Sequence, residues 1–340
     1  MRIQMPVAVL ALCASLVSHA ADKSSVAATA ALQSMMQSSS LDVPGVLPWH
    51  WKMDVILYDA DGKTQQNANL EVWYADGNMR TSMTLGADHL TLLRVGDALY
   101  GDNDISDAFV PLQIALMEAT HPIPDTLVSS TVNLKLTARK VGQIKLNCVE
   151  PVFVLPEANT FTMDAQLSFC RTDDTSQFVA HYQPNQNSVL RRRIGKFQER
   201  EVPIELELNA FGKRRVSVTT KTLETFTPTA DIFDPGSALQ PLPLVITVPQ
   251  PLQLVGLMLN KEAPHYPADA KSRHAEGTVT FDATIDTDGR ITSTTLTSKS
   301  DPALIDAAKD ALTHWIYRPF LINGKAVIVK TTITLHFNLA

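Results

Sequence analysis

The alternation of apolar and polar side chains is most regular in the last strand-like segment of the sequence. One face of this segment carries Val327, Val329, Ile333, Leu335 and Phe337. The other face carries Ile328, Lys330, Thr332, Thr334, His336 and Asn338. A period of two residues predicts a strand with one buried and one solvated face. Because this strand is the last in the sequence, we expect it at a sheet edge, where its unpaired backbone groups could take up an extended peptide.

We therefore predict a partner-binding edge along this strand. It comprises Val327, Ile328, Val329, Lys330, Thr331, Thr332, Ile333, Thr334, Leu335, His336 and Phe337. Two alternatives stand beside a partner's peptide, because a terminal strand is often paired in a homodimer or covered by its own chain. The sequence does not decide the oligomeric state.

A β-rich domain is predicted over residues 48–234. Its first strand alternates Trp49, Trp51 and Met53 with polar residues and stops at Asp61-Gly62. Turn signals such as Asp76-Gly77-Asn78 then separate short strands, as in an antiparallel meander. Further strands are predicted at 70–74, 79–85, 89–95, 132–137, 144–149, 162–169, 189–194, 205–208 and 216–223. One helix is expected at 107–119 despite Pro111, which makes the fold class α+β.

The segment from Pro264 onward predicts a small α/β unit with the order helix, strand, strand, helix, strand. Asp286-Thr-Asp288-Gly289 is a hairpin signal between its first two strands. The stripe of Leu304, Ala308, Ala311 and Trp315 predicts an amphipathic second helix, capped by Ser300 or Asp301. We assign residues 254–340 to this C-terminal domain.

Residues 235–253 form a proline-rich linker between the two domains. Five prolines lie between Pro235 and Pro251, a composition that disfavours helices and central strands. As polyproline II, this segment would be a semi-rigid spacer of roughly 50 Å that holds the domains apart.

The first twenty residues have the features of a cleaved secretory signal. A single cation, Arg2, precedes an apolar stretch that ends in Ser18-His19-Ala20. The stretch is shorter than the about 20 residues that span a bilayer, so we expect export to the periplasm with cleavage near Ala20. Retention of this segment would instead anchor the chain in the inner membrane, and Cys13 raises a lipoprotein alternative. Residues 21–47 are expected to be a flexible leader, in which the Ser/Ala/Gln stretch from Ser24 to Ser40 is either mobile or a frayed helix.

Cleavage would leave two cysteines, Cys148 and Cys170, in an oxidising compartment. We expect a disulfide, which would close a loop of roughly 20 residues and stabilise the fold by about 3 kcal/mol. Two buried thiols are the next alternative, and a metal site the third, because no other ligand stands at a suitable spacing.

Composition and motifs argue against several function classes. A net charge of -6 and no basic run longer than Arg191-Arg192-Arg193 give no footprint for nucleic acid. The histidines are scattered, and the sequence has no nucleophile elbow, phosphate-binding glycine loop or dinucleotide fingerprint. We therefore expect no catalytic residues, no metal and no cofactor, and a binding protein rather than an enzyme.

The C-terminal residues resemble the C-terminal domain of TonB-type energy transducers. The motifs are Pro264-x-Tyr266-Pro267 with Ala270, Glu276-Gly277-x-Val279, Asp288-Gly289, Asp306-x-Ala308, Trp315-x-Tyr317-x-Pro319, Gly324 and Phe337. In that family the domain docks onto outer-membrane TonB-dependent receptors, and a short receptor peptide adds as a strand along the last strand of the domain. The resemblance implies energised transport across the outer membrane. It also implies structural roles for Tyr266, Pro267, Gly277, Gly289, Trp315, Pro319 and Gly324.

This sequence departs from the family pattern at its N-terminal end. A transducer has an uncleaved membrane anchor and a long Pro/Lys/Glu-rich segment, and this sequence lacks a convincing form of either. Coupling to a proton gradient therefore does not follow from the resemblance.

The middle domain loosely resembles the half-barrel of periplasmic lipid and lipoprotein carriers, in which a curved sheet holds acyl chains against a helix. Two functions of different classes therefore stand. The first is an adaptor that docks onto outer-membrane receptors, and the second is a soluble carrier of lipid or lipoprotein that uses its TonB-like domain for docking. Neither the receptor nor the cargo can be named from the sequence.

Overall fold

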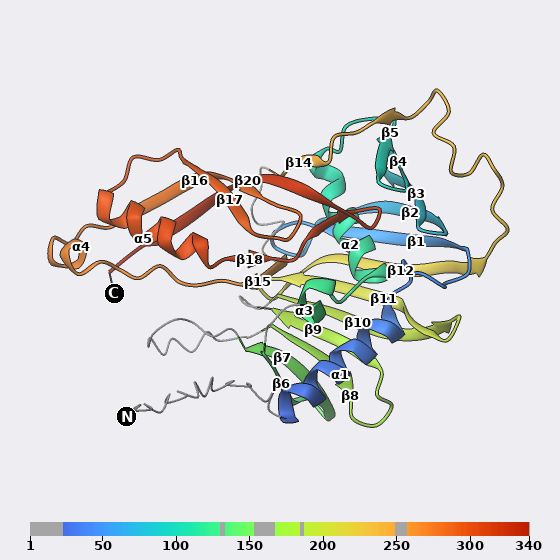
Figure 1. Ribbon diagram of the computed structural model, residues 1–340, viewed down its shortest axis with the longest axis horizontal. Helices are drawn as coiled ribbons and strands as arrows, with labels where there is room; N and C mark the ends of the chain where they lie inside the picture. Colours follow the sequence, from blue (N-terminus) through green and yellow to red (C-terminus); the bar gives the residue numbers. More distant parts are fainter. Residues whose placement is uncertain (1–22, 130–132, 153–166, 184–186, 249–256, 340) are drawn as a thin grey trace, which may run out of the picture.

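The computed structural model describes residues 23–129, 133–152, 167–183, 187–248 and 257–339 (Figure 1). The predicted signal segment, residues 1–20, lies outside this range. The first half of the chain contains α1 (Lys23–Ser39), β1 (Trp49–Tyr58), β2 (Gln65–Ala75), β3 (Asn78–Leu85), β4 (Asp88–Val95), β5 (Ala98–Gly101), the 3-10 helix η1 (Asp107–Phe109), α2 (Val110–Thr120), α3 (Asp125–Ser129), β6 (Asn133–Val141) and β7 (Ile144–Val152).

The second half contains β8 (Ser168–Thr172), β9 (Phe178–Gln183), β10 (Asn187–Phe197), β11 (Arg200–Ala210), β12 (Lys213–Thr225), β13 (Gln240–Pro241), β14 (Val245–Val248), β15 (Met258–Asn260), α4 (Ala268–Ser272), β16 (Gly277–Ile285), β17 (Ile291–Leu296), α5 (Pro302–Thr313), β18 (Ile316–Tyr317), β19 (Phe320–Ile322) and β20 (Lys325–Phe337). The fold is α+β, with a mostly antiparallel middle domain followed by a TonB-like domain, as predicted.

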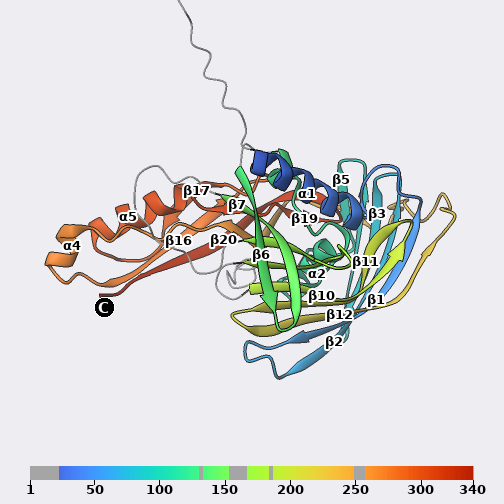
Figure 2. The same cartoon turned by 90° about the horizontal axis from the view of Figure 1, so that it is seen from below.

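The middle domain is one 13-stranded sheet, in the order β13-β5-β4-β3-β2-β1-β12-β11-β10-β9-β8-β7-β6. Neighbouring strands are antiparallel, and Figure 2 shows the sheet curving around α2. The predicted turn at Asp76-Gly77 has positive φ at both residues, +50° and +80°, which suits the twist of a two-residue hairpin. The strands β5 and β9 were not predicted, the first because it has only four residues.

The core begins at β1, where the predicted alternation places Trp49, Trp51 and Met53 on the inner face. The indole of Trp49 stacks on Tyr74, with ring centroids 5.4 Å apart, and its Nε1 donates to the Leu41 carbonyl at 2.9 Å. Both indoles are fully buried, so this face is packed core. The hydrogen bond to Leu41 satisfies the Nε1 group of Trp49, which burial of the indole would otherwise leave unpaired.

The predicted helix at 107–119 is present as η1 followed by α2, with Pro111 in the first turn, where a missing N–H costs nothing. Almost every residue of α2 after that turn is buried. The reason is that the helix lies between two layers: it contacts β11 and β12 of the large sheet on one side and β19 of the C-terminal domain on the other. A helix covered on two sides needs no polar face.

The prediction of a flexible leader over residues 21–47 was wrong. Residues 23–39 form α1, which contacts β6, β7 and β11. Its buried apolar side chains are Ala28, Leu32 and Met35, which recur at helical spacing and pack with Phe169 and Phe178. The alanine and glutamine content concealed an amphipathic stripe that tertiary contact stabilises.

The C-terminal domain has the predicted order, with α4, β16, β17, α5 and β20, and adds the short strands β15, β18 and β19. Asp301 caps α5 by accepting a hydrogen bond from the Ala303 amide at 3.0 Å, as the sequence predicts. Of the predicted stripe, Leu304, Ala308 and Ala311 are buried on α5, and Trp315 is buried directly after it. This stripe faces β16.

The prediction that residues 235–253 form a spacer between separated domains was also wrong. β13 pairs with β5 of the large sheet, and β14 pairs with β20 of the C-terminal sheet. The two domains share one continuous hydrophobic core, which extends from Trp49 to Phe281 and Trp315. The segment predicted as a linker therefore pairs with one strand of each domain, and the two domains are in contact. Residues 249–253 lie outside the described range.

The predicted disulfide is present. Cys148 in β7 and Cys170 in β8 are register partners, both fully buried, with their Cα atoms 4.0 Å apart. The bond therefore joins neighbouring strands rather than distant parts of the fold.

Candidate functional site

The last strand, β20, has the two faces that its sequence predicts. Every odd-numbered residue from Val327 to Phe337, including Thr331, is buried, and the even-numbered residues are exposed or half-buried. One edge of β20 pairs with β16 in antiparallel register, from Gly277↔Phe337 to Ile285↔Val329. On the solvated face, Thr280 and Thr334 approach each other across this pair, with 3.3 Å between their hydroxyls.

The other edge of β20 is not free along its whole length, which corrects the prediction from the sequence. On this edge, residues 328–331 pair in parallel with β14, and residues 325–327 pair with β19 in the hairpin that precedes them. The strand order is therefore β14-β20-β16-β17. Within the described part of the chain, no strand pairs with the outer edge of residues 332–337. The docking of a partner there remains a prediction.

The residues singled out by the family motif lie at positions that shape the fold. The Tyr266 hydroxyl donates to the Ala275 carbonyl at 2.6 Å, and its ring meets Phe337 edge-on. The indole of Trp315 donates to the Glu262 carbonyl at 2.8 Å. These contacts anchor the segment before β16 to the end of β20 and to α5.

The remaining motif residues occupy turns and element ends. Gly289 has φ +81°, and a Cβ there would lie 1.9 Å from the Tyr317 carbonyl oxygen, so no other residue fits. Pro267 is the N-cap of α4. Gly277 begins β16. Pro319 lies between β18 and β19.

The hairpin formed by β19 and β20 projects into the middle domain. At its tip, the Asn323 side chain donates to the carbonyls of Met79 and Leu92 at 3.0 and 3.1 Å and accepts from the Thr81 hydroxyl at 2.7 Å. Asn323 has φ +49°, which asparagine tolerates better than most residues, and is 1% exposed. Gly324 follows it at φ +73°. The tip thereby replaces water on the inner side of β3 and β4.

A cavity of about 540 Å³ lies between the inner face of the large sheet and the helices η1 and α2. Its apolar lining consists of Leu57, Ala60, Leu85, Ala108, Pro111, Ile114, Val189, Leu208, Ala210 and Val216. Asp59, Thr64 and Gln66 of its lining are exposed to solvent, whereas the side chain of Glu118, which also lines it, is buried. An apolar cleft with a few polar groups is the usual form of a site for an apolar ligand.

Glu118, in the lining of this cleft, is held by a buried ionic cluster. Its Oε1 accepts from Arg318 Nη1 at 2.6 Å, and its Oε2 lies 3.6 Å from His181 Nδ1. The Arg191 guanidinium donates to the backbone carbonyls of Glu118 and Glu201, and burial lowers the pKa of Arg191 to about 10. Burial also lowers the pKa of His181. Arg318 belongs to the C-terminal domain, so the ion pair with Glu118 joins the two domains inside the protein.

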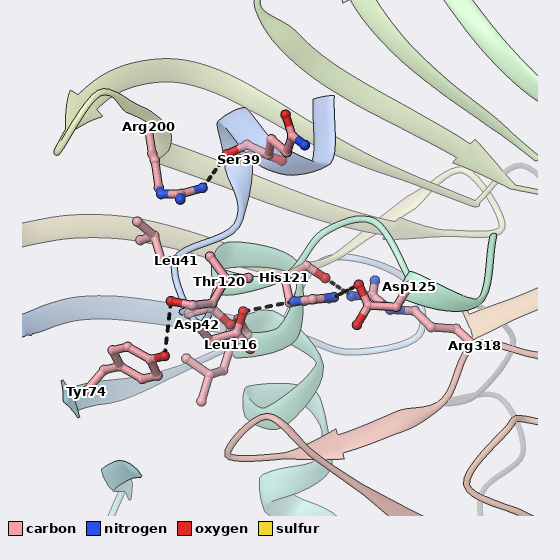
Figure 3. Close-up of polar contacts among 12 residues, drawn as sticks. Ser39, Leu41, Asp42, Tyr74, Leu116, Thr120, His121, Asp125, Arg200 and Arg318 are labelled. Carbon is pink, nitrogen blue, oxygen red and sulfur yellow. Dashed lines mark hydrogen bonds and ion pairs between the residues drawn. The ribbon is translucent and has the colours of Figure 1, made fainter. Parts of the chain in front are cut away.

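Next to this cluster, His121 is held between two carboxylates (Figure 3). Its Nδ1 lies 2.8 Å from Asp42 Oδ1 and its Nε2 lies 3.3 Å from Asp125 Oδ1. Burial lowers the pKa of His121, but the hydrogen bonds to Asp125 and Asp42 outweigh burial and raise it to about 9. Arg318 donates to the backbone carbonyl of His121. His121 is therefore a cation at neutral pH that ties the segment after α1 to the end of α2.

The sequence did not predict the contacts of Glu118 and His121, because most of their partners lie far from them along the chain. Glu118 and Arg318 are 200 residues apart, and Asp42 and His121 are 79 apart. No local pattern links residues at such separations. In the described ranges, no group of three or more His, Cys, Asp or Glu side chains could hold a metal ion. Within the same ranges, no helix is long and apolar enough to cross a membrane.

Comparison with known proteins assigns the C-terminal part of the chain. Residues 262–339 match the family model described as Gram-negative bacterial TonB protein C-terminal. The solved C-terminal domain of TonB from Pseudomonas aeruginosa is 30% identical, with 24% of this chain and 84% of that chain covered and a TM-score of 0.22. No curated protein matches the chain.

The remaining part of the chain matches solved structures of another kind. A LolA superfamily protein from Nitrosomonas europaea is 8% identical, with 60% of this chain and 97% of that chain covered and a TM-score of 0.40. A putative outer membrane lipoprotein-sorting protein domain from Vibrio parahaemolyticus is 7% identical, with 62% and 99% covered and a TM-score of 0.37. At these TM-scores the two alignments carry no argument about function.

Proposed function

We propose, because residues 262–339 belong to the family of Gram-negative bacterial TonB C-terminal domains, that this protein is a periplasmic adaptor that docks onto outer-membrane receptors. In this proposal a receptor's extended peptide adds as a strand to the outer edge of β20, and the protein takes part in transport without being an enzyme. The leader of residues 1–20 directs its export.

The observation that supports the adaptor is the outer edge of β20 along residues 332–337, with which no described strand pairs. An unpaired edge binds an extended peptide through main-chain hydrogen bonds. The solvated face of this stretch is polar, since it carries Thr332, Thr334 and His336. An incoming strand would therefore find an edge whose solvated face, within the described residues, is polar.

Site-specific photocrosslinking in the cell tests the adaptor. A photoreactive phenylalanine analogue replaces the exposed Thr334 in the full-length chain, and mass spectrometry identifies the adducts. We expect an adduct with the N-terminal segment of an outer-membrane receptor. The same analogue at Thr295, exposed on β17 at the opposite end of the sheet order, is the control. Adducts of equal yield at both positions, or none with a receptor, would contradict the adaptor.

A second function, carriage of a lipid or another acylated molecule, is favoured by the cleft beside α2. Its volume of about 540 Å³ and its apolar lining fall within the range of small-molecule sites. Mass spectrometry of an organic extract of the purified protein tests this function. A carrier should yield a stoichiometric lipid, whereas an adaptor with an empty cleft should yield none. The two functions are compatible, because the cleft and the edge of β20 involve different residues.

A further inference from the structure

β14 holds part of the surface that the adaptor needs. It pairs in parallel with β20 over four residues, from Val245↔Ile328 to Val248↔Thr331. The Ile328 amide donates to the Leu244 carbonyl at 2.9 Å, and the Thr331 hydroxyl donates to the Val248 carbonyl at 2.7 Å. The occupied stretch continues directly into residues 332–337. A receptor strand longer than six residues would therefore meet β14.

The side chains of β14 follow the pattern of a strand that fits this edge. Ile246 and Val248 are buried, at 6% and 0% exposure, and join the hydrophobic core of the C-terminal domain. Thr247 between them is exposed. The edge thus accepts β-branched apolar side chains at alternate positions of a parallel strand.

Several features indicate that β14 is held weakly. Among the described residues it pairs on one side only in the strand order, and a parallel pair is less stable per residue than an antiparallel pair. Pro243 precedes it and Pro249 follows it in the sequence, and neither can donate to a ladder. A cavity of about 410 Å³ lies between Val245–Thr247 and the segment Asp104–Asp107, so part of the strand has no packed layer against it.

Because of how β14 is attached to the middle domain, it can separate from β20 without unfolding either sheet. Before β14, the Leu242 amide donates to the Leu99 carbonyl at 2.8 Å, and β13 pairs with the end of β5. These contacts lie at the last strand in the order of the large sheet. Displacement of β14 would interrupt no strand in the interior of either sheet.

We propose that β14 is a resident strand that occupies the docking edge of β20 in the free protein and is exchanged for the partner's strand on docking. This inference rests on the proposed function, to which it adds a competitor within the chain. A tethered strand acts at an effective concentration on the order of millimolar, so it lowers the apparent affinity of a free strand for the same edge.

The probe for strand exchange is a fluorescent peptide that carries the sequence of residues 242–248 with added lysines for solubility. Binding to the full mature chain is measured by anisotropy. Ile246→Pro removes a ladder donor and a buried side chain from β14, and Ile246→Val keeps both the strand and its burial. We expect Ile246→Pro to bind the peptide about 10- to 100-fold more tightly than the wild type, and Ile246→Val to match the wild type.

A reversible lock tests the same inference without weakening the fold. Thr247 and Lys330 are register partners, and both are exposed, so a T247C/K330C pair is within reach of a disulfide. We expect the oxidised pair to bind the peptide at least about 10-fold more weakly than the wild type, and reduction to restore binding. T247C alone and the wild type under the same reductant are the controls, because Cys148–Cys170 is also present.

The outcomes separate this inference from the proposed function. If circular dichroism shows that Ile246→Pro does not fold, strand exchange is judged from the T247C/K330C disulfide experiment alone. Strand exchange would be overturned if the wild type, Ile246→Pro and oxidised T247C/K330C bound the peptide with equal affinity. It would also be overturned if none of these proteins bound the peptide. A receptor adduct at Thr334 of equal yield in the locked and unlocked protein would leave the adaptor in place while removing β14 as its competitor. Peptide exchange without any receptor adduct would contradict the adaptor alone.

Discussion

The two sheets of this protein bury their apolar faces to different extents. In the C-terminal domain, α5 closes over β16, and Phe281, Leu304 and Ala308 are completely buried. In the middle domain, α2 leaves a cavity of about 540 Å³ beside Pro111 and Ile114. The same alternation of side chains thus produces a closed core in one domain and an open cleft in the other.

The difference arises from how far a helix extends over its sheet. α2 has 11 residues, which make a helix about 16 Å long. The 13 strands of the large sheet span roughly 60 Å at their usual spacing. α2 alone cannot cover such a sheet, and part of the inner face beside η1 and α2 lines a cleft. The C-terminal domain can therefore bind a partner at the edge of its sheet, whereas the middle domain can bind a ligand on the inner face of its sheet.

The largest loss of stability is expected for a substitution in the closed core, and it is compared with a substitution in the wall of the cleft. Phe281→Ala should lower the free energy of unfolding by about 4 kcal/mol, because it leaves a cavity among fully buried neighbours. Ile114→Ala, on the half-buried cleft wall, should cost about 1 kcal/mol. Urea unfolding followed by circular dichroism measures both. Equal losses would mean that the cleft wall is packed as tightly as the core.

The next effect concerns the ion pair that joins the two domains. Arg318→Met should destabilise the protein by about 3 kcal/mol, because it leaves Glu118 buried without its strongest partner. The double variant E118Q/R318M should recover part of this loss, since Glu118 is then no longer a buried carboxylate without its arginine. Calorimetry should show one transition for the wild type and two for Arg318→Met. A single transition that is unchanged in Arg318→Met would mean that this ion pair does not couple the unfolding of the two domains.

A pH dependence is expected from His121, which lies at the same junction. Its pKa of about 9 in the folded protein exceeds the ordinary value of 6.5, so its stabilisation is complete below pH 6.5 and is lost as the pH rises through 9. Between pH 6 and pH 9 this loss should reach about 2 to 3 kcal/mol. His121→Gln should remove this slope in urea unfolding. A slope that persists in this variant would assign it to other groups.

The smallest expected effect probes the cleft itself. Ile114→Trp should fill part of the cavity and weaken the binding of a dansylated fatty acid about 10-fold, with little change in stability. The control is Ile56→Trp, on a half-buried position of β1 that does not line the cleft. Fluorescence titration measures both variants. If the two variants bind the fatty acid alike, the ligand occupies another surface.

The prediction from sequence succeeded where neighbouring residues carry the information. The faces of β1 and β20, the helix at α2, the cap at Asp301 and the Cys148–Cys170 bond all follow from local patterns or from a single pair. It failed at α1, at the linker and at the edge of β20. In each of these cases the contact that decides the structure comes from a distant segment, such as β6 for α1 and β14 for β20.

The amino-acid sequence by itself therefore determined most of the longer strands, which face of β1 and β20 is apolar, and which family the C-terminal domain resembles. Periodicity and capping are local, and the family motif lies within one contiguous stretch. Only the tertiary structure decided that the domains share one core, that Glu118 meets Arg318, and that β14 lies on the edge of β20. These contacts join distant segments, with Glu118 and Arg318 200 residues apart, and the energy that selects among them depends on packing in three dimensions.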